Sequence, residues 1–190
     1  MNLNFTYDLD KEFDNIQRGV GKYNPNHQPK LLIEILEASI NVQEKEKVLH
    51  FLNLKIKNEH LDTELAAKIL QLQWDNIEEE VTKRFDTVFN TRDPFENITA
   101  YLTLNSRCAY NTQLQYFFVS IYGAQPIGIV IHVLLHFYTH RFIEPLFVHE
   151  DKPSAFGDFK EALTVLINQI FLDLVEGKDE GYQQQHELRN

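Results

Sequence analysis

The stretch of sequence that decides the fold is IGIVIHVLLHFYTHRFI, residues 127–143. Its β-branched residues would also permit a strand. Its length favours a helix, and Pro126 stands where the first turn of such a helix would begin. Because apolar side chains would lie on almost every face, we expect this helix to be buried. The pair Glu144-Pro145 then marks its end.

Two histidines interrupt this apolar stretch at a spacing of four residues. On a helix, His132 and His136 are rotated by only about 40° and lie one turn apart on the same face. Both imidazoles could then bind one metal ion such as zinc, which sits about 2.0–2.1 Å from histidine nitrogens. His140 extends the row but drifts further round the helix. The alternative is that hydrogen bonds in the core hold both rings and that no metal is bound.

Ahead of this helix the pattern changes to short runs of β-formers. Residues 98–104 and 115–122 are rich in Ile, Tyr, Phe and Thr, which is typical of strands. The segment between them, residues 105–111, predicts a loop long enough to be functional. A small antiparallel or mixed sheet is therefore expected in the middle of the chain.

The remaining segments read mostly as helices. Apolar residues recur at helical spacing over residues 31–40 and 61–89, with Thr63 near the start of the second segment. After a loop over residues 150–157, a last helix is expected from Asp158 to Leu174, with Asp158 as its N-cap. The predicted class is α+β in a single domain spanning 1–190: residues 1–90 are mainly helical, and 95–190 hold the sheet and two buried helices that carry the site.

Composition narrows the classes of function. The 190 residues carry a formal charge of -10 with a pI of about 5.2, and nucleic-acid binding is not expected of so acidic a chain. A single cysteine, Cys108, rules out an intrachain disulfide, and we interpret it as an inert small residue. With no signal peptide or long apolar span in the sequence, we expect a cytoplasmic protein that makes no contact with membranes.

Two strings in the sequence resemble a known family. IHVLLHFYTHRF, residues 131–142, is similar to the active-site helix of zincin-like metallopeptidases, whose core is His-Glu-x-x-His. DFKEALTVLIN, residues 158–168, resembles the second helix of the gluzincin type, which supplies a glutamate as third ligand. The resemblance implies a zinc cofactor held by His132, His136 and Glu161.

The same resemblance implies further roles. Tyr182 or His186 would polarise the carbonyl group of the substrate, as a downstream Tyr or His does in gluzincins. The strand over residues 98–104 would lie along the cleft as an edge strand, and a peptide or protein segment would pair with it. For both features there is a plainer interpretation: a solvated polar tail and an ordinary strand of a sheet.

The sequence departs from the family at position 133. Valine stands where a working zinc peptidase has the glutamate that takes a proton from metal-bound water. The loss of general-base catalysis typically costs about 10²–10⁴-fold in rate. The leading hypothesis is therefore a zincin-like metal-binding protein that is impaired or inactive in hydrolysis, a pseudoenzyme.

Two alternatives stay open at this point, and so does the question of whether the chain is an enzyme. The first is an active metallohydrolase whose general base comes from elsewhere, with Glu144, Glu150 and Asp158 as the available carboxylates. The second is a non-catalytic protein-interaction domain without metal.

Overall fold

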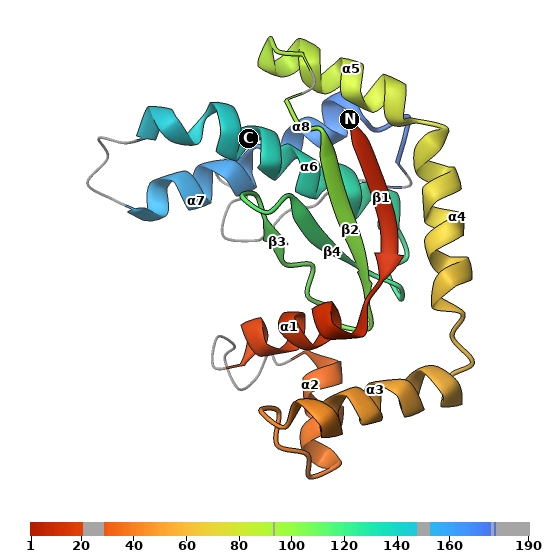
Figure 1. Ribbon diagram of the computed structural model, residues 1–190. Coiled ribbons are helices and arrows are strands. Elements are labelled where there is room, and N and C mark those ends of the chain that lie inside the picture. The colour runs from red at the N-terminus through yellow and green to blue at the C-terminus, as the bar shows by residue number, and fades with distance from the viewer. Residues whose placement is uncertain (21–28, 93, 148–152, 176, 178–190) are drawn as a thin grey trace. The chain divides into compact units, whose positions relative to one another are not determined.

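A computed structural model of the chain describes residues 1–20, 29–92, 94–147, 153–175 and 177 (Figure 1). It is a mixed α/β structure with a helical N-terminal half and a small mixed sheet, which confirms the expected fold class. The elements, in chain order, are β1 (Asn2–Tyr7), α1 (Leu9–Gly19), α2 (Lys30–Glu37), α3 (Lys45–Asn58), α4 (Thr63–Asp75), α5 (Glu78–Phe89), β2 (Asn97–Thr103), β3 (Tyr110–Asn111), β4 (Tyr116–Ser120), α6 (Pro126–Phe142), the 3-10 helix η2 (Glu144–Phe147), α7 (Pro153–Ala162) and α8 (Val165–Ile170).

The chain divides into two compact units, and each draws on both halves of the sequence. We call the first the sheet unit; it comprises the described parts of residues 2–72 and 97–126. The second, the helical unit, comprises residue 1 and the described parts of residues 73–96 and 127–190. The division follows contacts between segments that are distant in the sequence.

The sheet unit is built on four strands in the order β1-β2-β4-β3. β1, β2 and β4 run parallel, whereas β3 is antiparallel to β4. The strands expected over residues 98–104 and 115–122 are confirmed as β2 and β4. β1 was not expected, and the two-residue β3 lies inside the segment 105–111 that was expected to be a loop.

β2 has no free edge. It pairs with β1 on one side and with β4 on the other, so a peptide that paired with residues 98–104 would have to displace a neighbouring strand. The open side of β1 is covered by a side chain of α4. The side-chain oxygen of Gln71, Oε1, accepts a hydrogen bond from the Phe5 N–H at 3.1 Å. The side-chain nitrogen of Gln71, Nε2, donates to the Leu3 backbone carbonyl at 3.0 Å. Such contacts satisfy backbone groups that would otherwise attract a further strand.

A buried polar network ties α1 to the end of β2. The Thr103 hydroxyl donates to Glu12 Oε1 at 3.0 Å, and the Leu104 N–H donates to Glu12 Oε2 at 3.3 Å. The Asn15 amide group in turn donates to Thr103 Oγ1 at 3.1 Å. Burial disfavours the charged carboxylate and raises the pKa of Glu12 to about 7, although these hydrogen bonds act in the opposite direction.

Two expectations about helices were wrong in part. The helical pattern of residues 61–89 is divided between α4 and α5. α4 begins at Thr63, as expected, and Asp62 caps it by accepting the Leu65 N–H at 2.9 Å. The helix expected from Asp158 begins earlier, at Pro153, so that Asp158 lies inside α7 and is not an N-cap. Residues 153–157, expected to be a loop, belong to this helix.

The core of the helical unit is aromatic. The Phe85 ring of α5 stacks on Tyr138 of α6, with centroids 4.6 Å apart, and contacts Phe171, just after α8, at 4.8 Å. Arg84 of α5 forms a two-pronged ion pair with Asp173 at 2.6 and 2.8 Å. α6 is the helix expected from residues 127–143: it begins at Pro126 and is buried over most of residues 130–139. Within the described residues, no helix combines the length and apolarity needed to cross a membrane.

Candidate metal centre

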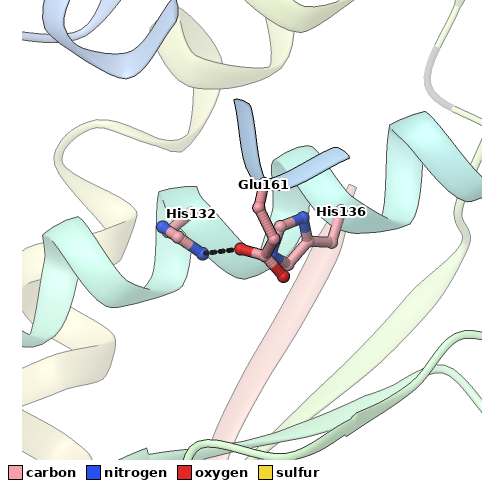
Figure 2. Close-up of side chains that lie close together, drawn as sticks. All are labelled: His132, His136 and Glu161. Atoms are coloured by element: carbon pink, nitrogen blue, oxygen red, sulfur yellow. Dashed lines mark ion pairs between the residues drawn. The ribbon is translucent and has the colours of Figure 1, made fainter. Parts of the chain in front are cut away.

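α6 presents its first two histidines to the same point in space (Figure 2). The His132 and His136 ring centroids are 4.6 Å apart, and the ring planes are nearly perpendicular at 87°. This arrangement follows from the spacing of four residues on a regular helix. The His136 side chain is buried, whereas that of His132 keeps 20% of its surface exposed.

α7 carries the third side chain, Glu161. Aromatic contacts within the helical unit pack α7 against η2 and the end of α6. The Phe147 ring lies 5.6 Å from that of Phe156 and 5.3 Å from that of Phe159, and the His140 ring lies 4.9 Å from that of Phe156. In the close-up the Glu161 carboxylate points toward both histidine rings of α6 (Figure 2).

The separations of the ligand atoms suit a metal ion. Glu161 Oε2 lies 3.5 Å from His136 Nε2 and 3.8 Å from His132 Nε2. Two ligands of a tetrahedral zinc ion, each about 2.0–2.1 Å from the metal, are about 3.4 Å apart. One nitrogen or oxygen from each of the three residues lies within 4.8 Å of the others, so this group could hold a metal ion.

The protonation states of His136 and Glu161 favour coordination. Burial lowers the pKa of His136 to about 4, despite the opposing influence of the Glu161 carboxylate. Burial by itself would raise the pKa of Glu161, but His136 and Lys160 outweigh that effect and hold it at about 2. At neutral pH the group therefore offers a neutral imidazole and an ionised carboxylate, and these are the forms that bind metals.

Lys160 is part of this site, although the sequence analysis did not identify it as a candidate residue. Its ammonium group contacts Glu161 Oε1, whereas both imidazoles pair with Oε2, and 14% of the Lys160 side chain is exposed. With one oxygen held by Lys160, Glu161 turns the other toward the histidines. The only signal in the sequence was that Lys160 precedes the expected ligand.

The other candidate residues do not join this group. His140 Nδ1 lies 2.8 Å from Glu144 Oε2, which makes a separate pair further along the helix. Asp158 is exposed on α7, and Val133 is buried with 3% of its surface exposed. Tyr182, His186 and Glu150 lie outside the described residues.

Cys108 lies in the sheet unit, whereas the residues of the candidate metal centre belong to the helical unit. Burial raises the pKa of its thiol, which disfavours the reactive thiolate. This agrees with the expectation that it is an inert small residue.

Comparison with known proteins gives no relative from which a function could be transferred. The chain matches no protein-family model, and neither a curated protein nor a solved structure is significantly similar to it. The interpretation of the site therefore depends on its own geometry and chemistry.

Proposed function

We propose that this chain is a zinc-binding protein of the zincin-like type that has lost efficient peptide hydrolysis. His132, His136 and Glu161 would hold the ion and leave a fourth position open. The observation that carries the proposal is the convergence of three ligand atoms from α6 and α7 within 4.8 Å. Two imidazoles and one carboxylate with an open position are a donor set that zinc takes in hydrolytic sites.

The residue beside the first histidine supports the loss of hydrolysis. Val133 cannot accept a proton, and it is buried. Of the carboxylates considered as replacements, Glu144 is paired with His140 and Asp158 is exposed to solvent. A bound zinc ion would still lower the pKa of its water, but without a positioned base the rate of proton transfer would be low.

Metal binding is tested with the full chain, purified without an affinity tag and titrated with Zn²⁺ by calorimetry. We expect one ion per chain. His132→Ala and Glu161→Gln each remove one ligand and should weaken binding by at least about 100-fold, since changes even to outer partners of metal ligands cost 10–100-fold. His140→Phe is the matched control, because it removes the imidazole that pairs with Glu144 but keeps a ring against Phe156 of α7.

Three results would contradict the proposal. Binding of less than one ion per chain would do so, and so would equal losses of affinity in His132→Ala and His140→Phe. Efficient, chelator-sensitive hydrolysis of a peptide library would contradict the second half of the proposal and require a base outside the residues considered above.

A further inference from the structure

We infer that the open coordination position of this site takes an oxyanion, such as a carboxylate or phosphate group, and that Lys160 provides the selectivity. This inference rests on the proposed metal site and names the class of ligand that the site would bind. It follows from the charges gathered around the two histidines and from the restricted exposure of the side chains that carry them.

The charges of the site do not balance once a divalent ion is present. The ion would bring two positive charges and Lys160 a third, whereas Glu161 is the single carboxylate of the group among the described residues. His132 and His136 bind as neutral imidazoles, and Val133 contributes no charge. The excess of two positive charges would be compensated best by an anion bound at the open position.

The low exposure of these side chains increases the energetic cost of the excess positive charge. The side chains of His132, Glu161 and Lys160 are exposed by 20%, 17% and 14%, and His136 is almost fully buried. Water screens charges poorly in such a setting, so an uncompensated positive charge is more costly here than at the surface. A neutral ligand such as an amide would leave the imbalance in place, whereas an oxyanion would reduce it.

The position of Lys160 explains how it could act on the anion without binding the metal. Its ammonium group already contacts Glu161 Oε1, so Glu161 would offer the metal Oε2, the oxygen that lies 3.5 Å from His136 Nε2. A carboxylate that binds through one oxygen leaves the fourth position to another ligand. The same ammonium group, held at the other oxygen of Glu161, adds a positive charge to the site.

The experiment uses the full chain loaded with Co²⁺, whose visible absorption reports changes in its ligands. Acetate, inorganic phosphate and acetamide are titrated at constant ionic strength. Acetamide is the neutral counterpart of acetate in shape and size. We expect both anions to change the spectrum and to saturate, and acetamide to have no effect.

Two variants identify the contribution of Lys160. Lys160→Met should weaken the binding of acetate and phosphate by about tenfold, the typical effect of one charge-assisted contact. Because Lys160 also contacts the ligand Glu161, Co²⁺ is supplied at a concentration that keeps the site of the variant loaded. Lys160→Arg keeps the charge and should bind anions like the unmodified chain. Circular dichroism of each variant reports whether it is folded.

The outcomes separate this inference from the proposed function. If Co²⁺ is not bound through His132 and Glu161, the proposed function fails and this inference with it. If Co²⁺ is bound but neither anion changes its spectrum, or if acetamide binds as tightly as acetate, only this inference is overturned. Equal anion affinity in Lys160→Met and the unmodified chain would likewise refute the role of Lys160.

Discussion

Replacement of Val133 by glutamate tests whether position 133 faces an accessible metal site or the packed interior. The buried position of Val133, 3% exposed, predicts that a glutamate there destabilises the fold and restores no activity. The substitution removes apolar packing and also buries a carboxyl group. We expect the carboxyl group to dominate, because an isolated buried charge has no solvent to stabilise it.

Glu12 gives the magnitude, because it is a buried carboxyl group in the same chain. Burial raises its pKa from a usual value of 4.5 to about 7. Each pH unit of such a change corresponds to about 1.4 kcal/mol, so a comparable carboxyl group at position 133 costs ~3 kcal/mol at pH 7.5. The raised pKa means that the folded state holds the proton more tightly. Stability is therefore lost as the pH rises from 4.5 to 7, and at pH 5.5 the cost is only ~1 kcal/mol.

The assay is urea unfolding of Val133→Glu and Val133→Gln at pH 7.5 and pH 5.5, with and without zinc. Glutamine has the size of glutamate but no charge, so the difference between the two variants isolates the carboxyl group. That difference should be ~3 kcal/mol at pH 7.5 and ~1 kcal/mol at pH 5.5. Equal stability of the two variants at pH 7.5, or peptide hydrolysis by zinc-loaded Val133→Glu, would refute the reasoning and place residue 133 at an open metal site.

Three further predictions concern the packing of each unit. Glu12→Gln should remove a pH dependence from the free energy of unfolding. Measured by urea unfolding, the stability of the variant relative to the unmodified chain should rise by ~3 kcal/mol between pH 4.5 and pH 8. A difference in stability that stays constant with pH would show that Glu12 ionises freely. Phe85→Ala should cost ~3–5 kcal/mol because it empties the centre of the aromatic core, whereas Leu146→Ala, at a side chain 75% exposed, should leave the thermal midpoint nearly unchanged. Gln71→Ala uncovers the outer edge of β1, so amide hydrogen exchange at Phe5 should become faster; unchanged exchange would mean that Gln71 does not protect this edge.

Sequence reasoning was most successful where the pattern is local. α6 was predicted with its start at Pro126, and β2 and β4 were predicted from their β-forming residues. It failed at boundaries that depend on neighbouring residues. α7 begins at Pro153, five residues before the expected N-cap, and β1 was not expected. β1 is a strand in this fold because it pairs with β2, about 95 residues further along the chain.

The sequence by itself determined that His132 and His136 form a pair, because the period of the helix places residues four apart on one face. It also determined the absence of a carboxylate at position 133. Only the tertiary structure decided that Glu161 Oε2 lies 3.5 and 3.8 Å from the two imidazoles and that Lys160 holds the other oxygen. These relations depend on how α7 packs on α6 through aromatic side chains. No local periodicity specifies that packing, because it results from contacts between segments that are separate in the sequence.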